Sequence, residues 1–371
     1  MKAAGCFAVF VFGGMLLAAF AGLLLLGAPP PQPIQPPEPE RRPVAAATPI
    51  PAASPPSGGY LSYVPRLGRF RRDEAGDRFD LGFGFIDHQG RTLYLDCGVA
   101  RADWQRENER FGYDATELHA ELNRRLRVLA DQELEHRGLT GMVKLRIYGS
   151  GAYEATPDFP DAAEPAEQSR RVAELRLFYA WLDSEFEKQS EAIQVELFRE
   201  RGFRLQNNKY FLDHRDIAVR NTALLSDCFR ALAEAGSGYR AREYLGMFTA
   251  FIQEIPYELP PDAVGRKKTI GLWVPTEVLV GHHGDCDSKS LTFAALWRNF
   301  DSPVVLIDLP HHMLVAVEVK PGPGENYIRI GNRYFVLCEV AGPGKLHPGA
   351  KPVSGQFEYV MIPPAEPPRS R

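Results

Sequence analysis

The sequence lacks several motifs that would assign a chain of 371 residues to a common functional class. Its 33 glycines form neither a phosphate-binding P-loop nor a dinucleotide-binding fingerprint. Positive charge is not concentrated, since the formal net charge is −4 and the basic runs, such as Arg266-Lys267-Lys268, are short. We therefore expect no nucleic-acid partner. The cysteines show no zinc-ligand spacing, and we expect neither a metal nor another cofactor.

Cysteine is also scarce, with five residues in the chain. One of them, Cys6, falls in the apolar N-terminal run, and the others are Cys97, Cys228, Cys286 and Cys338. In an oxidising compartment Cys97 and Cys228 are the best candidates for a disulfide. Separate buried thiols are the alternative, and the sequence leaves both open.

Charge is missing altogether between Ala3 and Ala28, a run dense in Leu, Phe, Ala and Val. As a helix this run is long enough to cross a hydrocarbon core, so residues 1–28 are predicted to be a transmembrane anchor, with a cleaved signal peptide as the alternative. Lys2 favours an N-terminus inside and the body on the extracytoplasmic (periplasmic) side of the cell membrane. Twelve prolines between Pro29 and Pro56 make residues 29–59 an extended linker.

Residues 60–161 are predicted to form a small α+β domain. Apolar residues alternate from Phe79 to Phe85, which indicates a strand, and residues 87–90 turn the chain into a second strand from Thr92 to Cys97. Leucines at helical spacing follow from Leu118 to Leu129, and alternation returns at 143–147. No residue pattern in this range indicates chemistry.

Residues 165–362 are predicted to hold a helical region and then a second α+β domain. Helices are expected over 172–186, 217–235 and 241–253, and a short helix after Asp285. Strands are expected over 304–309, 313–319, 327–330 and 333–339, with a turn at Gly331-Asn332. Helices followed by strands give the α+β class.

The run Gly284-Asp285-Cys286 is the strongest candidate for a site. Asp285 is a good helix N-cap, which puts Cys286 on the first turn of the helix. The N–H groups and the dipole of that turn favour an anion, so we expect a lowered thiol pKa and a cysteine nucleophile. The same N–H groups can hold an oxyanion. An inert buried cysteine is the alternative.

A base and an acid follow in the sequence. His312 heads the strand 313–319 and Glu339 ends the strand 333–339, so both can meet across one sheet. We expect one ring nitrogen of His312 at the Cys286 sulfur and Glu339 at the other. His311 and Asp308 are the alternatives for base and acid. A metal site formed by His282-His283 with Asp285 and Asp287 is disfavoured, because neighbours on a tight loop rarely converge on one ion.

These residues resemble the Cys–His–acid core of the transglutaminase-like superfamily. The resemblance covers residues 240–342 and includes Gly284-Asp285-Cys286, the histidine before a strand, and Tyr334-x-x-x-Cys338-Glu339-x-x-Gly342, with Ile255-Pro256-Tyr257 and Pro275-Thr276-Glu277 upstream. It implies a papain-like fold, with the cysteine helix packed on an antiparallel sheet, and acyl transfer through a thioester. Bacterial transglutaminase-like cysteine proteinases usually carry Cys-Glu-Asp-Tyr where this chain has Cys286-Asp287-Ser288-Lys289, so their calcium dependence is not carried over.

The sequence thus predicts a membrane-anchored, extracytoplasmic thiol enzyme. Its catalytic residues would be Cys286, His312 and Glu339, and its substrate a peptide or protein amide. Hydrolysis is favoured over cross-linking. The alternatives are a non-catalytic binding module of the cell envelope that keeps this fold and an envelope spacer whose globular part is incidental.

Overall fold

The computed structural model describes residues 67–149, 151–158, 164–300, 302–342, 344–353 and 357–365. The predicted anchor, 1–28, and linker, 29–59, lie outside these ranges. Among the helices within them, none is long and apolar enough to cross a membrane. The described chain is α+β with antiparallel sheets, the predicted class.

The N-terminal half runs through these elements: β1 (Arg69–Ala75), β2 (Arg78–Ile86), β3 (Thr92–Ala100), α1 (Arg101–Arg110), α2 (Ala115–His136), β4 (Val143–Tyr148), β5 (Ala152–Pro157), α3 (Pro165–Trp181), the π-helical turn η1 (Leu182–Phe186) and α4 (Glu187–Glu200). The remainder consists of β6 (Phe203–Gln206), β7 (Lys209–Leu212), α5 (His214–Leu224), α6 (Ser226–Ala235), α7 (Ala241–Glu254), β8 (Ala263–Val264), β9 (Lys267–Lys268), α8 (Pro275–Gly281), α9 (Cys286–Trp297), β10 (Val304–Leu309), β11 (His312–Glu318), β12 (Tyr327–Ile330), β13 (Arg333–Cys338) and β14 (Glu358–Ile362).

A five-stranded antiparallel sheet forms the C-terminal part, in the order β12-β13-β11-β10-β14. The predicted strands 304–309, 313–319, 327–330 and 333–339 are confirmed within a residue at each end. Gly331, at φ 60°, makes the turn between β12 and β13, a conformation that favours glycine. Because β11 lies between β10 and β13, its first residue is next to the end of β13.

Helix α9 packs on β10 and β11 of this sheet and is covered by α5, α7 and α8. It begins as predicted, since the Asp285 side chain accepts a hydrogen bond from Ser288 N at 3.0 Å. Every residue from Ser288 to Trp297 is buried. The helix is thus surrounded by protein, and its packing fixes the position of Cys286 at its N-terminus.

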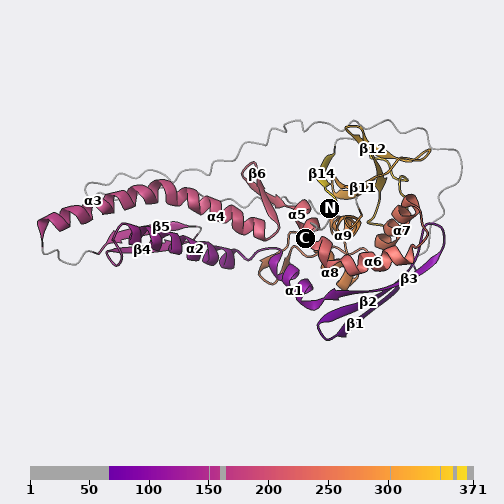
Figure 1. Cartoon of the computed structure of the whole chain (residues 1–371), viewed down its shortest axis with the longest axis horizontal. Helices are drawn as coiled ribbons and strands as arrows, with labels where there is room; N and C mark the ends of the chain where they lie inside the picture. The colour runs from indigo at the N-terminus through magenta and orange to yellow at the C-terminus, as the bar shows by residue number, and fades with distance from the viewer. Residues whose placement is uncertain are drawn as a thin grey trace, which may run out of the picture.

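The sheet β1-β2-β3 joins this same core. Phe83 and Phe85 of β2 contact Phe251 of α7, with ring centroids 5.1 and 5.5 Å apart. A second cluster of buried residues is formed by α2, β4, α3, η1 and α4. The predicted range 60–161 is therefore divided between two clusters, because the apolar face of β2 packs on α7. In Figure 1 the second cluster extends as an arm away from the five-stranded sheet.

The predicted helices are present with two differences. The range 217–235 is two helices, α5 and α6, because the backbone bends at Leu225, where φ is −99° and ψ is 9°. The range 172–186 ends in the π-helical turn η1, which continues directly into α4.

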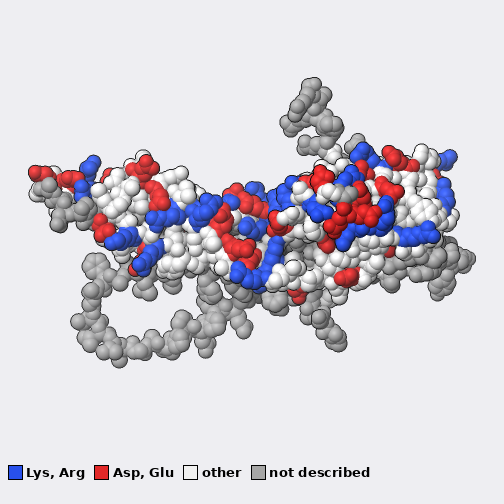
Figure 2. All heavy atoms as spheres, turned by 90° about the horizontal axis from the view of Figure 1, so that it is seen from below, with Lys and Arg blue, Asp and Glu red and all other residues white. Residues whose placement is uncertain are grey.

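Charges of both signs cover the face shown in Figure 2, where basic and acidic side chains lie beside each other. Many of them pair, as Arg125 does with Glu121 at 2.9 Å and with Glu200 at 3.2 Å.

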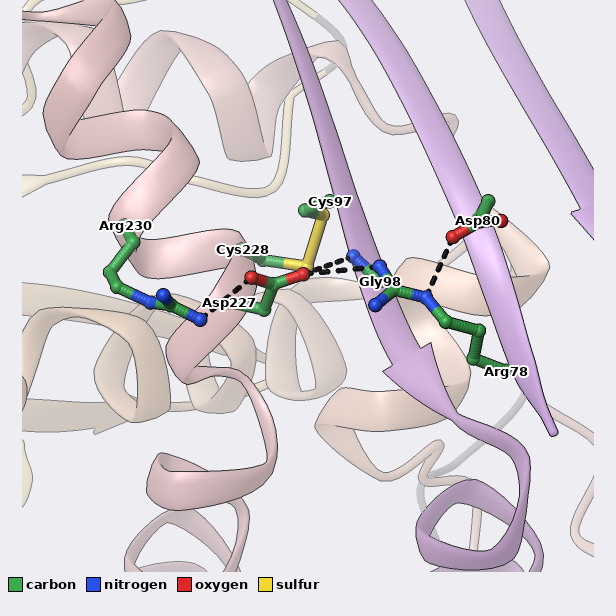
Figure 3. Close-up of a disulfide and its surroundings, with 7 residues drawn as sticks. All are labelled: Arg78, Asp80, Cys97, Gly98, Asp227, Cys228 and Arg230. Atoms are coloured by element: carbon green, nitrogen blue, oxygen red, sulfur yellow. Dashed lines mark hydrogen bonds and ion pairs between the residues drawn. A yellow bond between two sulfur atoms is a disulfide. The ribbon is translucent and has the colours of Figure 1, made fainter.

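A disulfide between Cys97 of β3 and Cys228 of α6 ties the three-stranded sheet to the helices (Figure 3). The sequence left open a disulfide or two separate buried thiols at these positions, and the structure has the disulfide. Beside it, Asp227 accepts a hydrogen bond from Gly98 N at 2.7 Å and pairs with Arg78 and Arg230 at 3.3 and 2.8 Å. The disulfide and Asp227 therefore fix the same contact between β3 and α6.

We predict that replacing both Cys97 and Cys228 by Ala destabilises the protein by about 2–5 kcal/mol, since the bond closes a separation of 131 residues. Denaturant unfolding of the full-length chain in detergent measures this. Dithiothreitol should lower the stability of the wild type and leave that of the double variant unchanged. Equal sensitivity of both proteins to reductant would contradict a stabilising bond.

Candidate functional site

The thiol of Cys286 lies at the N-terminus of α9, where it is 9% exposed. The segment after α7 runs alongside: Gly284 N donates to Pro256 O and Glu258 N donates to Gly284 O, both at 3.2 Å. These bonds place Tyr257, half exposed, next to the cysteine. Burial of its phenol and the nearby charge of Cys286 raise the pKa of Tyr257 to about 12.

The sulfur of Cys286 donates a hydrogen bond to Oδ1 of Asp287 at 3.2 Å. The backbone N–H of Met313, the second residue of β11, also acts on the sulfur and lowers its pKa. The thiol thus lies against the start of β11, the strand that His312 begins. Within the described ranges no hydrogen bond joins Cys286 to the ring of His311 or His312, so the expected contact of sulfur and imidazole is replaced by the one to Asp287.

The predicted lowering of the thiol pKa is wrong for this arrangement. Burial raises the pKa of Cys286, and the carboxylates of Asp287 and Asp285 raise it further. The favourable N–H groups of the first helical turn are opposed by two acidic residues on that same turn. In this structure the thiol is therefore protonated at neutral pH.

His312 and Glu339 form a close pair. Nε2 of His312, the first residue of β11, is 2.7 Å from Oε2 of Glu339, the residue after β13. The adjacency of β11 and β13 in the sheet produces this contact. His312 is 24% and Glu339 4% exposed in their side chains, so the pair lies at the edge of the interior.

The Glu339 carboxylate is held by several neighbours. Its Oε1 accepts from Ala341 N at 2.9 Å, and its Oε2 also accepts from Nζ of Lys351, which is 3.1 Å from His312 Nε2. Gln253 of α7 donates to the Glu339 backbone oxygen. Burial raises the pKa of Glu339, but the hydrogen bonds from His312 and Lys351 outweigh it and bring the pKa below its usual value. Glu339 is ionised at neutral pH.

The alternative base and acid occupy other places. His311 is exposed in the turn between β10 and β11, at φ 63°. Asp308 lies on β10 opposite Met313 and faces Glu358 of β14. Burial and the charge of Glu358 raise the pKa of Asp308. Glu339, not Asp308, is thus the carboxylate that binds the imidazole of His312.

The two upstream histidines point in different directions. His282 ends α8 in the left-handed conformation and stacks on Phe70, with ring centroids 4.1 Å apart. His283 stacks on Trp273 at 3.9 Å, and its Nε2 is 3.3 Å from Glu277. Among the described residues no group of three or more His, Cys, Asp and Glu side chains is placed to hold a metal ion.

The backbone N–H of Trp273 is already bonded inside the protein and is not a donor for an oxyanion at Cys286. That N–H donates to Oγ of Ser288 at 3.0 Å. On the first turn of α9 the N–H groups of Ser288 and Lys289 are bonded to Asp285, so the candidate donors for an oxyanion are those of Cys286 and Asp287. Met313 N is close enough to the sulfur to act beside them.

Lys289 is a functional residue that the sequence reasoning missed. Fully buried on the first turn of α9, it donates through Nζ to Ile255 O and to Ala341 O, both at 2.7 Å. It therefore ties the helix to the segments that carry Tyr257 and Glu339. A lysine inside an otherwise apolar helix was the available signal. Gln253 and Lys351 gave no comparable signal, because their partners come from other segments of the chain.

Comparisons with protein-family models, curated proteins and solved structures find no match to this chain.

We predict that Lys289→Met destabilises the protein by about 2–4 kcal/mol, because two buried carbonyl oxygens lose their donor. Denaturant unfolding measures the change. Lys188→Met is the matched control, since Lys188 is 70% exposed in a surface pair and its loss should change stability by less than about 0.5 kcal/mol. Equal effects of the two variants would show that the buried ammonium is not a structural tie.

Proposed function

We propose that this chain is a transglutaminase-like thiol enzyme that acts on peptide or protein amide bonds through a Cys286 thioester. The observation that carries the proposal is the 2.7 Å contact between His312 and Glu339, on adjacent strands beside the helix terminus that bears Cys286. A papain-like core consists of a cysteine helix packed on an antiparallel sheet, and α9 on β10 and β11 has that form.

The reaction assigns one role to each residue. The Cys286 thiol transfers its proton to Nδ1 of His312, and the sulfur attacks the amide carbonyl carbon. N–H groups of the first turn of α9 hold the resulting oxyanion. The imidazolium then protonates the amide nitrogen as the C–N bond breaks, which releases the amine and leaves the thioester. Glu339 binds Nε2 throughout and stabilises the imidazolium.

The second half of the reaction decides between two products. Water, deprotonated by His312, attacks the thioester carbonyl and gives a carboxylate with release of the thiol. A primary amine in the same place gives a new amide. We favour hydrolysis, which makes the protein a cysteine protease of the cell membrane, with the apolar run 3–28 as anchor and the catalytic part on the extracytoplasmic side.

A second candidate is a binding module of the cell envelope with the same fold and no turnover. The hydrogen bond from the Cys286 sulfur to Asp287 and the raised thiol pKa favour it. Formation of a covalent acyl-enzyme separates the two candidates, since a binding module forms none.

We predict that the wild type forms an acyl-enzyme with p-nitrophenyl acetate, seen by intact mass and by release of p-nitrophenol. Cys286→Ser should abolish it, because an alcohol is far less ionised than a thiol. His312→Ala should reduce the rate by about 10²–10⁴-fold, since the base both accepts and returns the proton. Glu339→Gln should lose less, about tenfold, because the amide still binds the ring but carries no charge.

His311→Ala is the matched control and should retain most of the activity. Loss of activity in His311→Ala with retention in His312→Ala would assign the base to His311. If the wild type forms no acyl-enzyme with the ester or with peptide amides, the binding module takes the place of the enzyme.

The anchor has its own test. An alkaline phosphatase domain fused after Gly59 should be active in a bacterial host, because this enzyme folds only outside the cytoplasm and residues 3–28 would carry it there. Green fluorescent protein exported by the same route should stay dark. A fluorescent fusion with inactive phosphatase would place the body inside.

A further inference from the structure

The acid–base pair and the thiol are not joined in this structure. Nε2 of His312 is bonded to Glu339, whereas the Cys286 sulfur donates to Asp287, its neighbour on the helix, at 3.2 Å. A thiol that donates its hydrogen bond to a carboxylate and not to its base is in a resting arrangement.

The groups around Asp287 are mostly acidic. Asp285 faces it from the same helical turn, Asp308 from β10, and His312 from β11. Burial, followed by the charge of Asp285, raises the pKa of Asp287 to about 6. The phenol of Tyr257, from the segment after α7, faces the same thiol.

Two more charged groups, Glu358 and Lys351, lie next to Asp308 and His312. Glu358 on β14 faces Asp308, and Lys351 binds Glu339 on the far side of His312. Neither makes a hydrogen bond to Asp287 within the described ranges. The Cys286 sulfur donates its hydrogen bond to Asp287, and the phenol of Tyr257 is the second ionisable group in contact with the sulfur.

We propose that Asp287 is a positioning residue that holds Cys286 as a protonated, resting thiol, which becomes a nucleophile when its hydrogen bond passes from Asp287 to His312. The inference rests on the proposed function for its purpose, but the thiol can be measured without any turnover. The charge of Asp287 opposes a second negative charge on the adjacent sulfur, and its oxygen accepts the bond that keeps the proton in place.

The sign of the pH dependence follows from the carboxyl group. Well above pH 6 Asp287 is charged and raises the pKa of Cys286, and well below pH 6 it is neutral and does so no longer. Asp287→Asn keeps the size and a hydrogen-bond acceptor but never carries the charge. Wild type and variant should therefore differ at neutral pH and converge in acid.

The test is the rate of iodoacetamide alkylation of Cys286 in the full-length chain in detergent, with the modified peptide identified by mass spectrometry. At about pH 8 Asp287→Asn should be alkylated about tenfold faster than the wild type or more, and below about pH 5 the two rates should agree within about twofold. Asp287→Glu should remain slow at pH 8, since it restores the charge.

Asp308→Asn is the matched control: it removes a carboxylate from the same surroundings but no bond to the thiol, and the rate should rise by less than about threefold. Thermal unfolding checks that each variant is folded. Equal rates for Asp287→Asn and wild type at pH 8, or a slower variant, would overturn the proposal, as would equal acceleration by Asp308→Asn. Absence of acyl-enzyme would refute the enzyme and leave this rate comparison intact.

Discussion

The buried ammonium of Lys289 is the constraint on which the site depends. It sits on the first turn of α9 and binds the carbonyl oxygens of Ile255 and Ala341. A lysine inside a protein requires such partners, because an unpaired buried charge is strongly unfavourable. Burial raises the pKa of Asp285, the residue that caps the helix, and the charge of Lys289 partly opposes that rise. One side chain thus fixes three segments: the start of α9, the end of α7 and the chain after β13.

Glu339 is held by hydrogen bonds to both its carboxylate and its backbone oxygen. The N–H of Ala341 donates a hydrogen bond to Glu339 Oε1, and its carbonyl oxygen accepts one from Lys289. Gln253 binds the Glu339 backbone oxygen and, at 2.9 Å, that of Leu346. The carboxylate therefore has little freedom, and His312 is oriented by a fixed partner. Preorganised groups of this kind lose nothing to reorganisation during a reaction. The thiol of Cys286 is held differently, since it donates its hydrogen bond to Asp287, a neighbour on its own helix.

Local patterns predicted the parts of the fold that depend on neighbours in sequence. The alternation at 304–309 and 333–339 gave β10 and β13, and Asp285 gave the start of α9, because strand period and helix caps act over a few residues. The order of Cys286, His312 and Glu339 led to the pair that the sheet brings together. The packing of β2 on α7 had no such signal, since an apolar strand face does not say which helix will cover it.

The pKa of Cys286 likewise depends on contacts that the local sequence pattern does not predict. Its place on a helix terminus predicted a lowered value, which is the effect of the first turn alone. The opposite direction comes from burial under β11 and from the carboxylates of Asp287 and Asp285. Asp285 caps the helix with a carboxylate, which places one acidic group beside the thiol. Asp287 adds a second, which the cap does not require.

The two carboxylates therefore have separable physical roles. The Asp285 carboxylate accepts a hydrogen bond from the Ser288 N–H inside the helix, while the Asp287 carboxylate accepts one from the Cys286 thiol. A thiolate formed without a substrate would be open to oxidation, and a protonated thiol is much less so. In the proposed enzyme, the free energy of binding an amide substrate beside the first turn of α9 would offset the work of moving the thiol proton to His312, so that the thiol ionises only when a substrate is bound.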